Sequence, residues 1–428
     1  MDYTADKIKE LRNDKLIRQK QNHVWLRISL LCNNKCIFCL DSWNQIWELQ
    51  TDEEIKKQVR ELFIPWKWNV ITIVWGEATI NPRFTEYIKY ARSIWYDQIN
   101  TISNWLMFSS LDFCKKAFEA WIDNLSFSIH WHTASLHDYL VGNPWAFRMA
   151  IKWIINIKKY FPNIPFAVSI VVNKLNVKFL PDILDFFIKL GVNSFALLQI
   201  VPWWKWFWWI KDKIYYDINK DIDYLLKAFS YSKRPWIKLI TNFFPIEVFE
   251  QYPELIPDPL NIKTEVTWED CYERFNKFIT SWWKDTPECY WENCVHCYLK
   301  NYCNDYIDKY NIPPLKIKDA IYIRWENHII DVIDKYWTDA DKFVEYLFSK
   351  NSKLINMPKC LNWSWLYQSY NDFKINWSIE EYTDCYIHDL NRKKSFACKK
   401  CIHNDSCEWI HINFLRSYGL KILKEIKN

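Results

Sequence analysis

The stretch LRISLLCNNKCIFCL, residues 26–40, sets three cysteines on one loop directly after a short apolar run. Their spacing is C-x3-C-x2-C, formed by Cys32, Cys36 and Cys39. Three thiolates with this spacing can converge on three irons of a 4Fe-4S cubane and leave the fourth iron without a protein ligand. Such an open iron can chelate a small molecule. For a lone three-cysteine loop, a zinc ion with one missing ligand is the alternative.

Outward from this loop, the chain alternates short apolar runs with amphipathic segments, which is the order of a parallel βα array. The expected strands are residues 25–31, 70–75, 98–103, 124–130, 166–172 and 194–200. The expected helices run from Thr51 to about Leu62 and near 83–94, 110–120, 145–160 and 177–190. The pattern predicts an α/β fold with a partial (β/α)6 barrel of the TIM type. The reactive loops of such a barrel follow the carboxyl ends of its strands, where the cysteine loop also falls.

Beyond about residue 230 the pattern changes, prolines become frequent and cysteines gather in two small modules. We expect an N-terminal helical extension (1–22), the barrel core (23–230) and two cysteine-rich modules (265–315 and 316–428). CVHCYLKNYC (294–303) and CKKCIHNDSC (398–407) share the spacing C-x2-C-x5-C, and two further cysteines precede each. The candidate metal ligands of the modules are Cys271, Cys289, Cys294, Cys297, Cys303, Cys360, Cys385, Cys398, Cys401 and Cys407.

Composition narrows the class of protein. The formal net charge is +5, and no long run of one sign marks a nucleic-acid arm. No apolar segment approaches the ~18 residues needed to span a bilayer, so we expect a cytoplasmic protein with neither a membrane nor a nucleic acid as partner. Reduced thiols are the rule in the cytosol, so the 14 cysteines indicate metal ligands in preference to disulfides.

The counts of two residue types are abnormal: 4 Gly and 28 Trp. Gly usually makes up about 7% of residues, and the excess of Trp matches the deficit of Gly. Our hypothesis is that most of these Trp are glycines, written as Trp because UGA codons were translated with the wrong genetic code. Trp75, Trp105, Trp131 and the segment VPWWKWFWWI (201–210) stand where turns and a flexible loop are expected. A genuinely Trp-rich protein is the alternative.

The cysteine loop resembles the signature of the radical SAM superfamily, in which an aromatic residue, here Phe38, precedes the third cysteine. VWGEATINP (74–82), with its Trp read as Gly, is similar to the Gly-Gly-Glu-Pro motif of that family, with Ala in place of Pro. ISNW (102–105) is similar to the family's Thr-Asn-Gly, and residues 126–147 are similar to a common fourth-strand segment. The resemblance implies that S-adenosylmethionine binds the open iron and is cleaved reductively to a 5′-deoxyadenosyl radical that abstracts hydrogen from a substrate.

The same resemblance implies a set of cofactor-binding residues: Phe38, Trp75, Gly76, Glu77, Asn104, Ser128 and Asn173. Ser128 could instead be an ordinary inward strand residue, and Asn173 could simply close a turn. His130, His132 and His137 could donate protons or bind metal, although such histidines more often line a pocket or cap a helix. Cys114 is expected in the core of its helix.

The cysteine-rich modules resemble the SPASM and twitch extensions of radical SAM enzymes, which carry auxiliary 4Fe-4S clusters. Because C-x2-C is also a zinc spacing, a zinc-stapled fold is the alternative. The resemblance implies an electron donor such as flavodoxin or ferredoxin, and a peptide or protein as substrate. Two further readings stay open: small-molecule or cofactor biosynthesis, and a non-catalytic, zinc-stapled binding module.

Overall fold

The computed structural model describes residues 21–39, 50–201, 212–266, 297–309, 320–322, 353–355 and 378–427, the last range without 406, 408–409, 413–414, 417–418, 421–422 and 424. Two compact units part between Asn242 and Phe243, and each is considered by itself. Most of the expected N-terminal extension lies outside the described residues. So do the candidate ligands Cys271, Cys289, Cys294 and Cys360.

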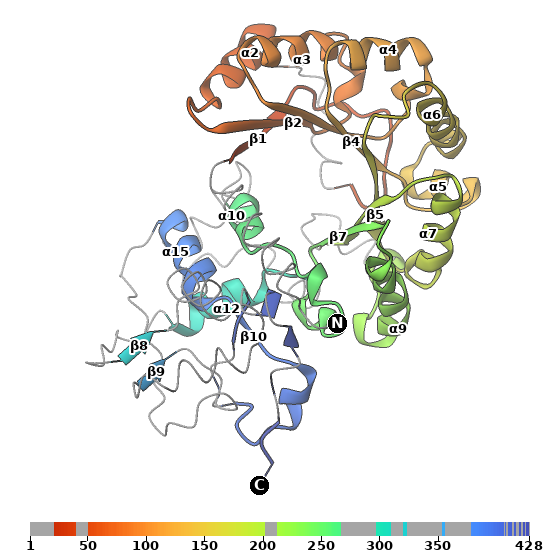
Figure 1. The fold of residues 1–428 in the computed structure, drawn as a ribbon. Coiled ribbons are helices and arrows are strands. Elements are labelled where there is room, and N and C mark those ends of the chain that lie inside the picture. The colour runs from red at the N-terminus through yellow and green to blue at the C-terminus, as the bar shows by residue number, and fades with distance from the viewer. Residues whose placement is uncertain are drawn as a thin grey trace. The chain divides into compact units, whose positions relative to one another are not determined.

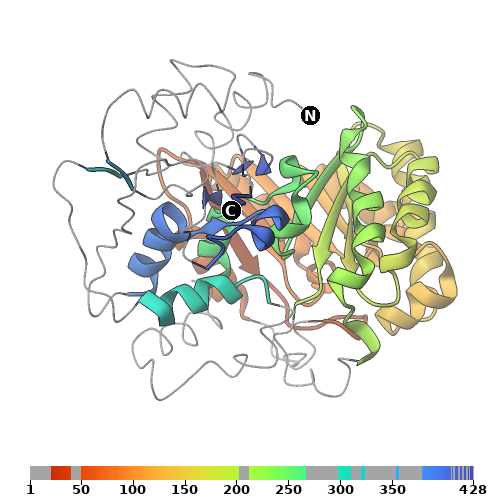
Figure 2. The same ribbon diagram turned by 90° about the horizontal axis from the view of Figure 1, so that it is seen from below.

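The first unit is built on seven parallel strands that follow one another in chain order across one sheet. The strands are β1 (Gln21–Arg27), β2 (Trp68–Val74), β3 (Gln98–Ser103), β4 (Asn124–Ser128), β5 (Phe166–Val172), β6 (Ser194–Gln199) and β7 (Lys238–Asn242). The sheet curls into a half-barrel with helices on its outer side (Figure 1, and from below Figure 2). The predicted partial TIM-type barrel is thereby confirmed, with one strand more than expected.

Helices connect successive strands of the half-barrel. They are α2 (Asp52–Glu61), α3 (Phe84–Ser93), α4 (Leu111–Glu119), α5 (Ala134–Val141), α6 (Ala146–Tyr160), α7 (Leu180–Lys189) and α9 (Ile218–Phe229). Short 3-10 turns lie at Ala78–Ile80, Met107–Ser109, Val177–Phe179 and Ser230–Lys233. Thr51 caps α2 as expected, in a capping box with Glu54 that satisfies backbone N–H groups of the first turn. None of the described helices is long and apolar enough to cross a membrane.

Alternation along the strands separates an outer from an inner face of the sheet. Fully buried apolar residues such as Ile71, Phe127 and Leu197 stand at the outward positions, beneath the helices. The inward positions are mostly polar, and register aligns them across the sheet: Asn100 with Asn124, and Ser128 with Ser169. Among the described strand residues of β1–β7, no Asp or Glu occupies an inward position. The concave face thus carries hydroxyl and amide groups suited to a polar substrate.

The described part of the second unit is smaller. It contains α10 (Leu260–Val266), α12 (Lys300–Lys309), α15 (Ile379–Cys385), the parallel pair β8 (Ala320–Tyr322) and β9 (Lys353–Ile355), and the antiparallel pair β10 (Arg392–Lys393) and β11 (Ile410–His411). One-turn helices lie at Ile246–Phe249, Pro253–Leu255, Tyr386–Leu390 and Phe396–Lys400. Tyr302 and Tyr382 pack edge to face, and the Tyr382 hydroxyl donates to the Tyr302 carbonyl at 2.7 Å.

Six Trp positions have a backbone conformation that side chains disfavour. Among the described residues, seven non-glycine residues have positive φ, namely Trp66, Trp75, Trp95, Trp105, Trp121, Trp145 and Phe243, with values from 67° to 84°. All four Gly residues lie in the same region. The indole N–H of Trp153 is also buried without a hydrogen-bond partner, which costs about 1–3 kcal/mol. These positions have the features that the glycine hypothesis predicts.

Candidate active site

The cysteine loop follows β1 and is held by the carboxyl end of α5. The N–H of Lys35 donates to the Val141 carbonyl at 2.9 Å, and the N–H of Ile37 donates to the Leu140 carbonyl at 3.0 Å. Gly142, at φ +60°, makes this approach possible, because a Cβ there would lie 2.5 Å from the Lys35 carbonyl oxygen. The loop is therefore fixed by main-chain bonds to a segment more than 100 residues away in the chain.

The three thiols of the loop lie close enough to influence one another. None of the three forms a disulfide, all are partly exposed, and the N–H of Cys39 donates to the Cys36 carbonyl at 3.1 Å. Burial, followed by the nearby Cys39 and Cys32 thiols, raises the pKa of the Cys36 thiol well above its usual value. Iron binding must therefore displace protons from the loop.

This donor set fits an iron-sulfur cubane. Within the described residues, no three His, Cys, Asp or Glu side chains are gathered as ligands of one metal ion. In a cubane, by contrast, each of the three thiolates binds a different iron, so the sulfurs need not surround one ion. Iron-sulfur clusters are held by soft thiolate ligands of this kind. The loop supplies three such sulfurs at the carboxyl edge of the sheet, so one iron would lack a ligand from this loop.

The turn after β2 packs against the start of the cysteine loop. Trp75 and Gly76 have φ of 75° and 52°, and the N–H of Glu77 donates to the Leu31 carbonyl at 2.7 Å. A Cβ on Gly76 would lie inside contact distance of that same carbonyl. Backbone atoms of this turn therefore lie directly beside the loop.

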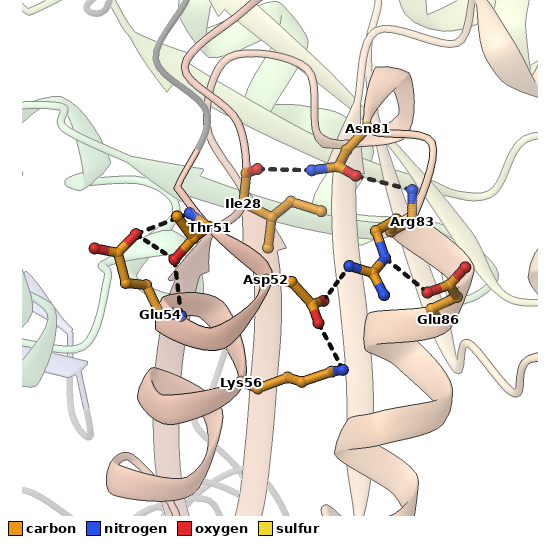
Figure 3. A network of polar contacts seen from close by, with 8 residues as sticks. All are labelled: Ile28, Thr51, Asp52, Glu54, Lys56, Asn81, Arg83 and Glu86. Atoms are coloured by element: carbon orange, nitrogen blue, oxygen red, sulfur yellow. Dashed lines mark hydrogen bonds and ion pairs between the residues drawn. The ribbon is translucent and has the colours of Figure 1, made fainter.

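A second set of contacts anchors the residues just past this turn (Figure 3). The side-chain amide of Asn81 donates to the Ile28 carbonyl at 2.9 Å, and its oxygen accepts from the Arg83 N–H at 2.9 Å. Arg83 pairs with Asp52 at the start of α2 at 2.9 Å, which in turn pairs with Lys56 at 2.7 Å. The end of β1, the start of α2 and the turn after β2 are thereby joined into one support for the cysteine loop.

The Glu77 carboxylate is an organiser of the next strand end. It is 2% exposed and accepts hydrogen bonds from the Thr79 N–H and hydroxyl, the Ser103 hydroxyl at 2.8 Å and the Asn104 N–H at 2.6 Å. Burial raises the pKa of Glu77, whereas these donors act in the opposite direction. Because its hydrogen bonds join Thr79 to Ser103 and Asn104, the Glu77 side chain fixes the end of β3 to the turn after β2.

The side chain of Asn104 connects the end of β3 to the cysteine loop. Its side-chain nitrogen lies 2.6 Å from Asn33 Oδ1 and 3.6 Å from the Cys32 sulfur. On the other side, the Asn143 amide donates to the Asn33 carbonyl at 3.1 Å and to Asn34 Oδ1 at 2.8 Å. Sequence reasoning did not single out these two loop asparagines or Asn143. The Asn-Asn pair inside the cysteine spacing was the available signal.

The remaining predicted cofactor residues lie at the ends of β4 and β5. Ser128 is partly exposed on the inward face of β4. Asn173 is fully buried, where its side chain accepts from the Leu175 N–H at 3.0 Å and donates to the Val171 carbonyl at 3.0 Å. These are the contacts of a turn-closing Asn.

The three candidate histidines do not form one cluster. His130 and His137 are each 2% exposed and lie together, with ring centroids 6.0 Å apart, whereas His132 stacks on Trp131. Burial, followed by the charge of His137, lowers the pKa of His130 well below its usual value. Burial also lowers the pKa of His137 to about 4, against a small opposing effect of Asp138. The ring of Phe38 meets that of His130 edge to face at 4.6 Å, which brings His130 to the cysteine loop.

Six of the ten candidate ligands in the cysteine-rich modules are described, and none of the six forms a disulfide: Cys297, Cys303, Cys385, Cys398, Cys401 and Cys407. Burial, with a smaller contribution from Cys407 and Cys401, raises the pKa of the Cys398 thiol. The C-x2-C-x5-C element of the second module thus brings its three sulfurs near one another. Cys114, outside the modules, is buried in α4, and its thiol donates to the Phe108 carbonyl at 3.0 Å, as a core cysteine would.

Comparison with known proteins identifies the domain. Residues 26–187 match the model of the Radical SAM superfamily. One curated relative is the GTP 3',8-cyclase of Nostoc punctiforme, which is 24% identical over 30% of this chain and 41% of that protein. Another is the probable GTP 3',8-cyclase of Sulfurisphaera tokodaii, which is 24% identical over 41% of this chain and 56% of that protein. The chain spans about half the length of these relatives.

Solved structures with related folds include Streptococcus suis SuiB bound to the precursor peptide SuiA, with 15% identity, 58% of this chain and 55% of that chain covered, and a TM-score of 0.41. Another is anSMEcpe with bound AdoMet and the Cp18Cys peptide, with 15% identity, coverage of 51% and 63%, and a TM-score of 0.43. The family match assigns a Radical SAM domain to residues 26–187, and this domain implies a 4Fe-4S cluster and S-adenosylmethionine as cofactors.

Proposed function

We propose that the radical SAM domain of residues 26–187 cleaves S-adenosylmethionine reductively at a 4Fe-4S cluster held by Cys32, Cys36 and Cys39, and directs the radical at a bound substrate. The observation that carries the proposal is the closeness of these three thiols on one loop, which main-chain bonds hold to α5 and to the turn after β2. When bound, the cluster supplies the electron that splits the cofactor into methionine and a 5′-deoxyadenosyl radical.

The residues around the loop have distinct roles in this proposal. The backbone of Trp75 and Gly76, free of side-chain bulk if Trp75 is a glycine, approaches the methionine amino group. Glu77 and Asn104 keep that turn and the cysteine loop in register through their hydrogen bonds. Ser128, on the inward face, is in a position suited to the ribose or carboxylate of the cofactor. Asn173 holds the turn at the end of β5 through its side-chain hydrogen bonds and so supports the site without contacting the cofactor.

For the substrate we propose a peptide or protein. The support is the likeness of the C-terminal cysteine pattern to SPASM and twitch modules, together with the mutual proximity of Cys398, Cys401 and Cys407. In this proposal the modules hold auxiliary 4Fe-4S clusters that pass electrons, and a flavodoxin or ferredoxin supplies them. The inward face of the half-barrel, with amides and hydroxyls and no carboxylate among its described strand positions, suits the backbone of a peptide.

A second candidate is small-molecule or cofactor biosynthesis, which the names of the two curated relatives favour. A short peptide gene beside this one would support the first substrate class, and a neighbouring cofactor pathway would support the second. Either way the chain would cleave S-adenosylmethionine, whereas a zinc-stapled binding module would not.

Anaerobic reconstitution with iron and sulfide tests the proposal. Protein made from a gene with Gly at the ambiguous Trp positions is incubated with S-adenosylmethionine and dithionite, and 5′-deoxyadenosine is measured by mass spectrometry. We expect 5′-deoxyadenosine from this protein and none from the Cys36→Ser variant. A protein that takes up zinc but no iron, or that holds iron and never yields 5′-deoxyadenosine, would show that the proposal is wrong.

A further inference from the structure

His130 lies where β4 and β5 separate. A backbone bond joins the two strands from the Ile129 N–H to the Ser169 carbonyl, at 3.0 Å. One step further, the N–H of Val171 donates to Nδ1 of His130 at 3.1 Å. The imidazole thus takes the place of a main-chain acceptor at the carboxyl edge of the sheet.

These contacts fix which ring nitrogen carries the proton. In a neutral imidazole one nitrogen donates and the other accepts, so an Nδ1 that accepts from Val171 leaves the proton on Nε2. The lowered pKa of His130 keeps the ring neutral at physiological pH. His130 therefore presents an N–H donor at Nε2 and has no freedom to exchange it for an acceptor.

The Nε2–H donor is nearly buried and lacks a protein partner. His130 is 2% exposed, its backbone groups bond to His137 and Asn176, and no described residue forms a hydrogen bond with Nε2. Nε2 is also not fully sealed from solvent. A ligand with a hydrogen-bond acceptor would satisfy this donor.

The imidazole that carries this donor contacts the cysteine loop. Phe38, between Cys36 and Cys39, meets the His130 ring edge to face at 4.6 Å. A ligand anchored at this loop by its methionine end has its nucleoside left to reach the edge between β4 and β5. Nucleosides offer ring nitrogens and ribose oxygens, all of which accept hydrogen bonds.

We propose that His130 binds the nucleoside of S-adenosylmethionine through a hydrogen bond from Nε2–H. The inference rests on the proposed function and adds to it a residue of the nucleoside site. His137 offers a matched comparison, because its Nδ1 likewise accepts a backbone N–H, from His130 at 3.2 Å, while its ring packs near Phe147.

The test is the dissociation constant of S-adenosylmethionine, measured by isothermal titration of reconstituted, unreduced protein. Asn at position 130 retains an acceptor in the place of Nδ1 and lacks the Nε2 donor, so His130→Asn should keep its iron and bind about tenfold more weakly, the effect of one hydrogen bond. His137→Asn should bind as the wild type does. A His130→Asn protein with full iron and an unchanged dissociation constant would overturn the inference and leave the proposed function intact.

A second measurement avoids the variant's folding altogether. In wild-type protein with ¹⁵N-labelled histidine, the Nε2–H signal of His130, assigned by its loss in His130→Gln, should shift when S-adenosylhomocysteine is added. A signal that does not move while S-adenosylhomocysteine binds would also overturn the inference. Wild-type protein that holds iron but binds neither nucleoside would overturn the proposed function together with the inference.

Discussion

The N–H of Glu77 donates a 2.7 Å hydrogen bond to the carbonyl of Leu31, the residue that directly precedes the first cysteine of the loop. This bond connects the turn after β2 to the start of the cysteine loop. Because three thiols must meet one cluster, a shift of the turn is also a shift of the ligands. The turn and the loop therefore form one functional element, although 45 residues separate them in the chain.

Gly76→Ala tests this element. At φ +52° the new Cβ would lie inside contact distance of the rigid Leu31 carbonyl, so we expect lower iron uptake on reconstitution and weaker S-adenosylmethionine binding. Gly191→Ala is the control, since its φ is +82° but its Cβ would meet only the flexible end of Lys158, at 2.8 Å. Gly191→Ala should lose stability alone, by about 1–2 kcal/mol. Equal iron content in the two variants would contradict the role of the turn.

The glycine hypothesis predicts opposite signs for two exposed Trp residues. Trp121 follows α4 at φ 72° and is 69% exposed, so Trp121→Gly should raise the free energy of unfolding by about 1 kcal/mol. Trp68 lies in strand β2 and is 51% exposed, so Trp68→Gly should lower it by about 0.5–1 kcal/mol. Urea unfolding measures both. The idea fails if Trp121→Gly destabilises the protein as Trp68→Gly does, or if the gene has UGG at Trp121.

Iron analysis separates ligand cysteines from core cysteines. Cys36→Ser should reduce the iron of the reconstituted protein by about four atoms per chain, because a cubane cannot assemble on two loop thiolates. Cys114→Ser should keep its full iron content and lose only stability, since its thiol bonds to the Phe108 carbonyl in the core. Iron loss in the Cys114 variant, or full iron in the Cys36 variant, would refute the ligand assignment.

His137 gives the half-barrel a defined acid sensitivity. Its pKa is lowered in the folded state to about 4, so the unfolded chain takes up the proton first as the pH falls. The part of the free energy of unfolding that depends on a neutral His137 is fully present above pH 6.5. It amounts to up to about 3 kcal/mol and is lost as the pH falls from about 6.5 to 4. His137→Asn, which retains an acceptor and cannot titrate, should show a shallower decline in urea unfolding over this range at matched iron content. Identical slopes would contradict the assignment.

Much of the fold follows from periodicity, and its deviations have physical causes. Apolar runs at the six expected strands lie in the observed sheet, because buried parallel strands require such runs. The strand β7 was missed because KLITN is short and half exposed. The chain leaves β4 at Ser128, two residues before the predicted end, because the side chain of His130 replaces a main-chain acceptor.

The candidate site was predictable in part. The thiol spacing and the Gly-Glu turn are local patterns, so the sequence could reveal them. The hydrogen bonds that join Asn143 and α5 to the cysteine loop could not be predicted, because they connect segments about 110 residues apart in the chain. Glu77 was predicted only as a cofactor-binding residue, because its hydrogen bonds with Ser103 and Asn104 likewise join separate segments of the chain.

We propose that the three loop thiols leave one iron open to the amino and carboxylate groups of S-adenosylmethionine. Electron-nuclear double resonance on the reduced, reconstituted protein tests it directly, with S-adenosylmethionine carrying ¹⁵N in its amino group and ¹⁷O in its carboxylate. We expect hyperfine coupling of both labels to the cluster, and none in Cys32→Ser. A reduced cluster that shows no coupling to either label would contradict it.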